Sequence, residues 1–502
     1  MSAVGNMDIR ELTALELGTL IKEKKISSVE ATKAFIDAAK HDLKKDSYDK
    51  TRINAFTEIY EENALAAAEA VQKRIDKGEA LSPLAGVPIA IKDNICSTEG
   101  TTTAASKILG GFRSPFDADA VERLREAGAV IIGKTNMDEF AMGSTTENTY
   151  YGAVRSPWNM EHVPGGSSGG SAAAVTAGLV PMALGSDTGG SVRQPCGFSN
   201  LTGLKPTYGS VSRHGLVAYA SSLDQIGPMA LDARDCAALL SVISGRDERD
   251  STSEGNLSGA FQNANKLKIG IPKNYFEYSE LDSCIKARVL EAADIFRKQG
   301  AEIIDIDLPL LEYTIPTYLV ISRAEACSNL ARFDGVKYGY RAEGAKTIEE
   351  VYAKSRGEGF GDEVKRRVLF GYFILSSENF DTYFLQAQKV RGMIIKEYDK
   401  ALESCDMLLS PVSPVPANKI GEHTDDPEKM YSDDIYTASL NLTGLPGAAA
   451  PCGFDKNEMP VGMQLIGRKN EDRLLLDTLM RFQEETGFHK KRPALFEKGG
   501  VL

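Results

Sequence analysis

The sequence is poor in the residues that metal sites and disulfide frameworks require. Its 502 residues include five histidines, and its seven cysteines are dispersed, with no Cys-x-x-Cys pair. An odd, scattered set of cysteines in a long chain is typical of reduced thiols and fits neither a disulfide framework nor a zinc site. We therefore expect no metal site, and a reducing compartment such as the cytoplasm.

Long apolar runs and an excess of positive charge are also absent. No stretch reaches the ~20 apolar residues that span a bilayer, and residues 1–40 lack the basic start and apolar core of a signal peptide. The 58 Lys and Arg against 70 Asp and Glu leave a net charge of −12, whereas a general nucleic-acid binder needs a basic face for phosphates. This composition predicts a soluble, cytoplasmic protein that binds neither membranes nor, by itself, nucleic acid.

Strand-like and helix-like segments alternate along much of the chain. An apolar run over residues 86–92 precedes a helix-like stretch at 119–127 and a second apolar run at 129–132, and the same alternation returns at 268–306 and 382–486. Such alternation is typical of an α/β protein whose parallel or mixed central sheet is covered by helices on both faces.

Helical patterns without strands mark the start of the chain and one later segment. Ser27 and Glu30 form a capping-box pattern ahead of an amphipathic stretch, and residues 310–400 carry long helical patterns with little strand signal. We predict N-terminal helices packed on the core over residues 1–80. We also predict a single domain over residues 81–490, in which the helical insertion at about 310–400 forms one wall of a cleft.

Two glycine–serine segments lie close together, Gly165-Gly-Ser-Ser-Gly-Gly-Ser171 and Asp187-Thr-Gly-Gly-Ser-Val-Arg193. Glycine lets the backbone approach a ligand and aim successive N–H groups at one point, which a serine nucleophile needs for its oxyanion. The simpler interpretation is a pair of ordinary loops. A phosphate-binding loop is disfavoured because no lysine follows the glycines, and the Gly-x-Ser-x-Gly elbow of the α/β-hydrolases is absent here.

Two kinds of residue could activate such a serine. His162 and His214 flank the glycine–serine segments and could serve a Ser-His-Asp triad. Lys92 ends a buried-looking strand and is followed by Asp93 and Asn94, and ligands of open α/β sheets bind beyond the carboxyl ends of strands. A lysine at a strand end can equally lie in solvent, so these residue patterns alone leave the base open.

Three motifs in this order resemble those of the amidase signature family. They are Gly-Val-Pro-Ile-Ala-Ile-Lys92-Asp-Asn, the Gly-Gly-Ser-Ser-Gly-Gly-Ser block, and Gly-Ser-Asp-Thr-Gly-Gly-Ser191-Val-Arg-Gln-Pro, and their spacing also agrees with the family. The resemblance implies a single α/β/α domain with a mixed central sheet. It implies that Ser191 is the nucleophile, Ser167 a bridging serine held by a cis Gly166–Ser167 bond, and Lys92 the final base.

The resemblance also implies how the reaction is supported. Lys92 has to be neutral to accept a proton, so burial has to lower its pKa by roughly 3 units from about 10.4. The family pattern places the oxyanion hole in the backbone amides of four consecutive residues, namely Thr188, Gly189, Gly190 and Ser191.

Within that family the chain resembles the A subunits of glutamyl-tRNA(Gln) amidotransferases. The similarity is carried by segments at 136–148, 203–213, 221–228, 328–335, 359–367 and 441–447, with one departure at His214, where relatives usually carry an aromatic residue. The resemblance implies a glutaminase that supplies ammonia to a B subunit. That partner would use ATP and Mg²⁺ and make most of the tRNA contacts, a small C subunit would complete a heterotrimer, and this chain would need no cofactor.

Free glutamine carries an α-carboxylate and an α-ammonium besides the amide that reacts. A selective site should meet them with a guanidinium and a carboxylate. The resemblance assigns Arg367 and Asp434 to these roles, with Tyr318 lining the site, and it leaves the adjacent Arg366 and Asp433 as alternatives. Two other functions stay open, namely a freestanding amidase for a small-molecule amide and a non-catalytic binding module or scaffold.

Overall fold

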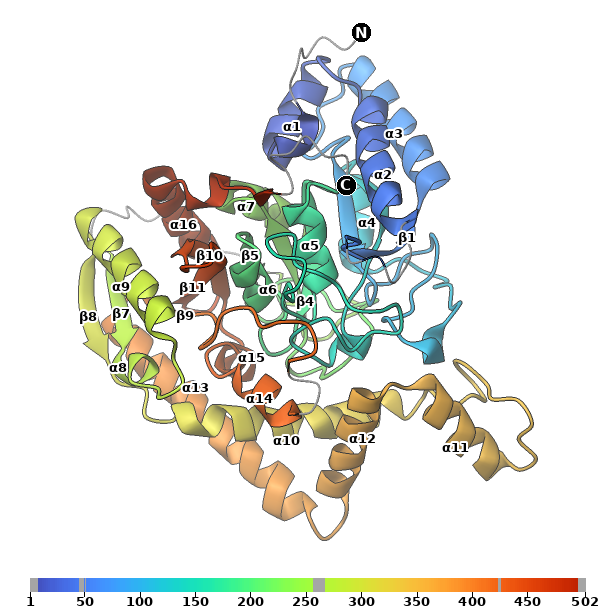
Figure 1. The fold of residues 1–502 in the computed structure, drawn as a ribbon, viewed down its shortest axis with the longest axis vertical. Helices are drawn as coiled ribbons and strands as arrows, with labels where there is room; N and C mark the ends of the chain where they lie inside the picture. The colour runs from blue at the N-terminus through green and yellow to red at the C-terminus, as the bar shows by residue number, and fades with distance from the viewer. Residues whose placement is uncertain (1–7, 45–48, 50, 256–266, 423–425, 495–502) are drawn as a thin grey trace.

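A computed structural model describes residues 8–44, 49, 51–255, 267–422 and 426–494 (Figure 1). One eleven-stranded sheet runs through it, in the order β1-β3-β2-β4-β6-β5-β10-β11-β9-β7-β8. The strands are β1 (Phe56–Ile59), β2 (Pro88–Lys92), β3 (Val130–Thr135), β4 (Met182–Asp187), β5 (Thr202–Lys205), β6 (Gln225–Ala230), β7 (Lys268–Pro272), β8 (Glu302–Ile306), β9 (Met407–Pro411), β10 (Gly447–Phe454) and β11 (Pro460–Gly467).

The sheet is mixed, which confirms the predicted fold class. Strand β2 pairs in parallel with β3 and β4, and β7 pairs in parallel with β8 and β9. The pairs between them in the sheet, from β4–β6 to β11–β9, are antiparallel. Because β2 and β4 run side by side in the same direction, their last residues, Lys92 and Asp187, lie at the same edge of the sheet.

Helices pack around the sheet and extend beyond it at both ends of the molecule. Figure 1 shows α1, α2 and α3 together at one end, and α10 to α13 along the opposite end. The helices are α1 (Ala14–Lys22), α2 (Ser28–Lys44), α3 (Glu61–Asp76), α4 (Asp119–Glu126), α5 (Gly169–Thr176), α6 (Arg193–Phe198), α7 (Ala233–Ile243), α8 (Lys273–Phe276), α9 (Ser283–Lys298), α10 (Leu311–Leu330), α11 (Ile348–Gly359), α12 (Asp362–Leu375), α13 (Gln386–Ser404), α14 (Pro427–Ser432), α15 (Ala438–Thr443) and α16 (Asp472–Thr486).

Local sequence explains where the first helices begin. The predicted capping box of α2 forms, because the Glu30 amide donates to Ser27 Oγ at 3.1 Å and the Ser27 amide donates to Glu30 Oε2 at 2.9 Å. Thr13 and Glu16 make the same reciprocal pair at the start of α1. Each box satisfies two backbone donors that a helix N-terminus leaves free. The first part of the predicted N-terminal helical segment, residues 1–7, lies outside the described residues.

The segment after β8 is helical, as its sequence pattern predicts. Helix α10 runs for 20 residues and continues through Pro316, and it packs against α12 and α13. Part of this arm stays open to solvent: Leu369 and Tyr372 on α12 are 70% and 72% exposed. In the part of the chain that the structure describes, no helix has the length and apolar character needed to cross a membrane.

Candidate active site

Lys92 ends β2 and is fully buried, so the interpretation of a strand-end lysine in solvent is wrong. Its Nζ lies 2.7 Å from Ser167 Oγ, 2.8 Å from Ser168 Oγ and 3.2 Å from the Ser186 carbonyl oxygen. Burial lowers the pKa of Lys92 to about 7, although nearby carboxylates act in the opposite direction. At neutral pH a large share of this amine is therefore unprotonated and able to take a proton from a serine hydroxyl.

The loop that carries Ser167 is held by its neighbours on both sides. The Gly166–Ser167 peptide bond is cis. The Gly166 amide donates to Gln194 Oε1 at 2.9 Å, and the Asp138 amide donates to the Ser167 carbonyl at 3.2 Å. A Cβ at position 166 would lie 2.2 Å from Asp138 Oδ2, so only glycine fits there. These contacts fix the backbone from which the Ser167 hydroxyl reaches Lys92.

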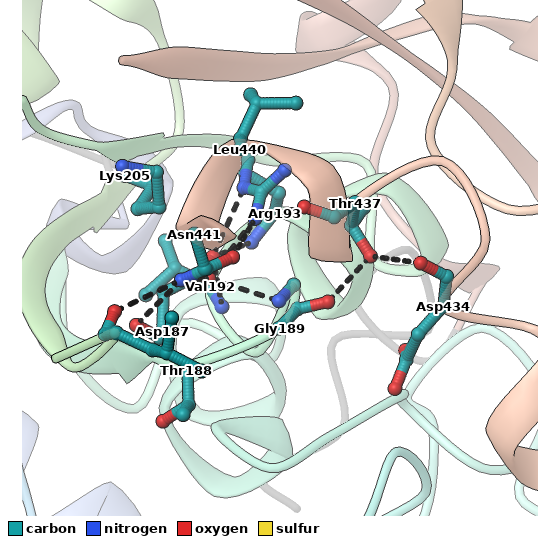
Figure 2. A network of polar contacts seen from close by, with 12 residues as sticks. Asp187, Thr188, Gly189, Val192, Arg193, Lys205, Asp434, Thr437, Leu440 and Asn441 are labelled. Atoms are coloured by element: carbon teal, nitrogen blue, oxygen red, sulfur yellow. Dashed lines mark hydrogen bonds and ion pairs between the residues drawn. The ribbon is translucent and has the colours of Figure 1, made fainter. Parts of the chain in front are cut away.

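The loop that carries Ser191 is organised around the buried carboxylate of Asp187 (Figure 2). Arg193 donates to it from Nε and NH2 at 3.1 and 3.0 Å, and the amides of Gly190 and Val192 donate at 2.9 and 3.1 Å. Burial alone would raise the pKa of Asp187, but the Arg193 guanidinium brings it down to about 2. The loop therefore closes around a carboxylate that stays ionised across the physiological range.

Ser191 is the accessible member of the serine–serine–lysine set. It retains 8% exposure, whereas Lys92 and Ser167 have none. The Ser168 amide donates to the Ser191 carbonyl at 3.2 Å, which joins the two serine loops directly. Among the described residues, no hydrogen bond connects the hydroxyls of Ser167 and Ser191, so in this state the two loops are linked through the backbone.

The amides around Ser191 differ in whether they are free to bind a ligand. The Gly190 amide is committed to Asp187, and the Thr188 side chain is held by Asp224 Oδ1 at 2.7 Å. Within the described residues, the backbone N–H groups of Thr188, Gly189 and Ser191 donate no hydrogen bond. Of the four amides assigned to an oxyanion hole, these three are uncommitted.

The C-terminal half of the chain fixes this loop from the other side. Figure 2 shows Thr437 and Asn441 above the Asp187 loop. Thr437 Oγ1 donates to the Gly189 carbonyl at 2.6 Å, and Arg193 donates to Asn441 Oδ1 at 2.8 Å and to Gln464 Oε1 at 3.0 Å. Residues 437–464 thus position the loop that carries Ser191, although the two segments are far apart in the sequence.

A second cluster, formed by α10, α12 and the segment that follows α14, contains the residues assigned to glutamine. Arg367 is 4% exposed; its Nε donates to Glu363 Oε1 at 2.7 Å and its NH1 to the Tyr219 hydroxyl at 2.8 Å. The Arg366 side chain is 48% exposed and approaches Glu363 from the solvent side. Of the two adjacent arginines, Arg367 is therefore the one that faces the interior.

Asp434 and Tyr318 connect this cluster to the nucleophile loop. Asp434 Oδ2 accepts a hydrogen bond from Ser144 Oγ at 3.0 Å. Burial raises the pKa of Asp434 to about 8, while the charge of Arg367 acts in the other direction. The Tyr318 ring lies against Gly189, where a Cβ would come within 2.6 Å of Tyr318 Cζ. Asp433 is also buried, at 7% exposure.

The histidine alternative finds no support in the geometry. His162 Nδ1 lies 2.8 Å from the Ala417 carbonyl, and the His214 ring stacks on Phe116 at 5.0 Å. Among the described residues, neither imidazole has a hydrogen bond to Ser167 or Ser191. All seven cysteines are free, and the described part of the chain holds no group of three or more potential His, Cys, Asp or Glu metal ligands.

Sequence reasoning missed two residues that contact this site. Ser168 shares Lys92 Nζ with Ser167, and Gln194 bridges two loops, because its Nε2 donates to the Ser144 carbonyl at 3.1 Å while its Oε1 accepts from Gly166. Both lie inside the quoted motifs. Their closeness in sequence to Ser167 and Ser191 could have marked them as residues of the site.

Residues 35–476 match the family described as Amidase, so the chain belongs to the amidase family. The A subunit of the glutamyl-tRNA(Gln) amidotransferase of Agathobacter rectalis is 52% identical to it, over 95% of the chain and 94% of that protein. The protein of the same name from Carboxydothermus hydrogenoformans is 48% identical, over 97% of the chain and 100% of that protein.

The solved structures give the same grouping. The crystal structure of the glutamyl-tRNA(Gln) amidotransferase A subunit from Thermotoga maritima superposes with a TM-score of 0.76 at 39% identity, covering 96% of each chain. The chain is thus similar over nearly its full length to proteins that carry this name, in sequence and in fold.

Proposed function

We propose that this chain is the glutamine-hydrolysing A subunit of a glutamyl-tRNA(Gln) amidotransferase, and that Ser191, Ser167 and Lys92 perform the hydrolysis. The 2.7 Å contact between Lys92 Nζ and Ser167 Oγ carries the proposal, because it joins a buried amine with a pKa of about 7 to a serine beside the nucleophile loop. The similarity to named A subunits over about 95% of the chain supports the choice of reaction.

The proposed chemistry uses the three groups in turn. Ser191 Oγ attacks the side-chain amide carbon of glutamine while its proton passes to Ser167 Oγ, whose own proton passes to Lys92 Nζ. The free amides of Thr188, Gly189 and Ser191 hold the oxyanion. When the intermediate collapses, Lys92 returns its proton to Ser167 Oγ, which passes a proton to the amide nitrogen as the C–N bond breaks. Ammonia leaves, and a glutamyl ester remains on Ser191. Water then hydrolyses that ester by the reverse relay and releases glutamate.

The second cluster selects the substrate. Arg367 binds the α-carboxylate and Asp434 the α-ammonium, with Tyr318 between the cluster and the nucleophile loop. A bound ammonium draws the pKa of Asp434 down from about 8, because an adjacent cation favours the ionised carboxylate. In this proposal each charged group of glutamine meets a side chain of opposite charge.

The ammonia serves a partner in a cytoplasmic assembly. In this proposal a B subunit uses ATP and Mg²⁺ to activate the glutamate of Glu-tRNA(Gln), receives the ammonia and makes most of the tRNA contacts. A small C subunit completes the heterotrimer. The net charge of −12 supports this division, since a tRNA-gripping subunit needs a basic face.

Copurification tests the proposal. A tagged chain expressed with its native operon or genome should bring down B and C subunits, and the assembly should convert Glu-tRNA(Gln) to Gln-tRNA(Gln) with glutamine as donor. The isolated chain should be a weak glutaminase whose turnover rises when partners are added, because a neighbouring subunit often orders the loops of a site. Equal turnover with and without partners would favour a freestanding amidase.

A further inference from the structure

Arg323, on the buried side of α10, is a cation without a hydrogen-bond acceptor. It is 8% exposed, its Nε is buried and unpaired, and within the described residues its guanidinium donates no hydrogen bond. Two aromatic rings hold it instead: its Cζ lies 4.6 Å from the Tyr431 ring centroid and 4.8 Å from that of Phe370. Buried charged groups are normally paired, so this guanidinium calls for a partner of opposite charge.

The surrounding cluster has a surplus of positive charge. Three arginines gather here, and the Glu363 carboxylate is hydrogen-bonded to two of them, Arg366 and Arg367. Glu363 already accepts from Arg367 Nε and from the Tyr431 hydroxyl, each at 2.7 Å, and from Arg366. Burial and the neighbouring charge of Arg367 lower the pKa of Arg323 below its ordinary value. An anion from outside the chain would therefore be strongly favoured beside Arg323.

The same aromatic ring links Arg323 to the residue assigned to the substrate. The Cζ of Arg367 lies 5.3 Å from the Tyr431 ring centroid that Arg323 also covers. Arg367 has donors already committed to Glu363 and to Tyr219, whereas every donor of Arg323 is free. A carboxylate has room for about four hydrogen bonds, so two guanidinium groups can share it.

We propose that Arg323 is a second carboxylate-binding residue, which acts beside Arg367 to make the site require an amide that carries an α-carboxylate. This inference rests on the proposed glutaminase function and deepens it. Arg323 supplies the uncommitted donors and Arg367 the fixed geometry. The pair rejects amides without an acid group, because such substrates leave the donors of Arg323 unpaired.

The test compares two substrates in the assembled enzyme. Glutamine and 4-aminobutanamide differ only in the α-carboxylate. Arg323→Met removes the charge and keeps an apolar chain of similar length against Phe370 and Tyr431. We expect KM for glutamine to rise about 10- to 100-fold, the range for losing a hydrogen bond to a charged group, with a smaller change in kcat. The kcat/KM for 4-aminobutanamide should stay at its low wild-type value, so the preference for glutamine collapses.

Two further variants separate binding from folding. Arg323→Lys keeps the charge and should recover part of the glutamine KM. Arg332→Met removes an exposed arginine just beyond the end of the same helix and should change neither substrate. Equal losses on both substrates, or wild-type kinetics in Arg323→Met, would overturn the inference. A wild-type assembly without glutaminase activity would instead refute the proposed function.

Discussion

The centre around Lys92 and the cluster around Arg367, which we propose selects glutamine, are both buried, yet their charged groups behave in opposite ways. Lys92 is surrounded by two hydroxyls and a carbonyl, and burial brings its pKa down to about 7. Burial also opposes the charge of Arg367, but Tyr219 and Glu363 hold the pKa of Arg367 well above its ordinary value. The partners, more than the depth of burial, decide whether a cation is kept. The region around Lys92 is suited to proton transfer, and the region around Arg367 keeps its charge fixed.

The largest expected loss of activity comes from removing the nucleophile. Ser191→Ala should lower glutaminase activity roughly a thousandfold or more, because no acyl-enzyme can form without the hydroxyl. The charge-holding cluster stays intact, so the variant should still bind glutamine. Ammonia-dependent formation of Gln-tRNA(Gln) by the assembly, measured in the same preparation, should be unchanged. Loss of both activities together would contradict the proposed division of labour.

Removing the fixed cation is expected to come next in size. Arg367→Ala leaves the substrate carboxylate without its guanidinium partner, and losing one side of a buried charged pair costs about 2–5 kcal/mol. Glutaminase kcat/KM should therefore fall roughly 30-fold to several thousandfold. Arg367→Lys should rescue little, because the two-pronged guanidinium geometry is lost.

The control for that variant is a reaction that needs no glutamine. Ammonia supplied directly should restore product formation in Arg367→Ala. Near-normal glutamine kinetics in Arg367→Ala would instead indicate that Arg366 binds the α-carboxylate, and Arg366→Ala would be the variant to examine.

The pH profile sharpens the comparison, because both regions titrate near neutrality. Lys92 acts as a base only when unprotonated, and Asp434, whose pKa is about 8 in the free enzyme, has to be ionised to bind an ammonium. Because both groups must lose a proton, kcat/KM should rise about hundredfold per pH unit below about 7 and about tenfold per unit between about 7 and 8. Asp434→Asn should abolish the upper rise and leave a rise of about tenfold per unit below about 7. A profile that falls with pH between 5 and 8 would exclude Lys92 as the base.

The smallest expected effect comes from the residue that joins the two regions. The Gln194 side chain accepts a hydrogen bond from the Ser167 loop and donates one to the Ser144 carbonyl. The Ser144 hydroxyl in turn contacts Asp434. Gln194→Met keeps the length but leaves two buried backbone groups unpaired, which should cost about 1–3 kcal/mol in the free energy of unfolding. Both kcat and KM should change about tenfold or less. Gln386→Met, on the exposed start of α13, is the matched control in urea denaturation and in the assay; similar effects of the two variants would remove Gln194 from the site.

Local periodicity predicts the outer part of the fold well and the middle of the sheet poorly. The strand–helix–strand alternation predicted over residues 268–306 appears as Lys268–Pro272, Ser283–Lys298 and Glu302–Ile306. Strands β6 and β10 were not predicted, since Gln225-Ile-Gly-Pro-Met-Ala and Gly447-Ala-Ala-Ala-Pro-Cys-Gly-Phe contain residues that rarely favour strands. Their burial between neighbouring strands overrides that local preference.

The site shows the same limit. Motifs within about 100 residues point to the serines and Lys92, but contacts across long stretches of chain cannot be read from them. Arg193 reaches Gln464 across 271 positions, and no local pattern marks that pairing. The commitment of the Gly190 amide to Asp187 likewise depends on how the loop closes in three dimensions.

The dependence of the nucleophile loop on the last third of the chain has a consequence for biosynthesis. Lys92, Ser167 and Ser191 have all left the ribosome long before the residues that hold their loop, Thr437, Asn441 and Gln464, have been translated. A nascent or prematurely terminated chain thus carries every reacting group but cannot set the loop in place. We therefore expect unfinished chains to leave glutamine intact, and ammonia release to begin once residues 437–464 have been made.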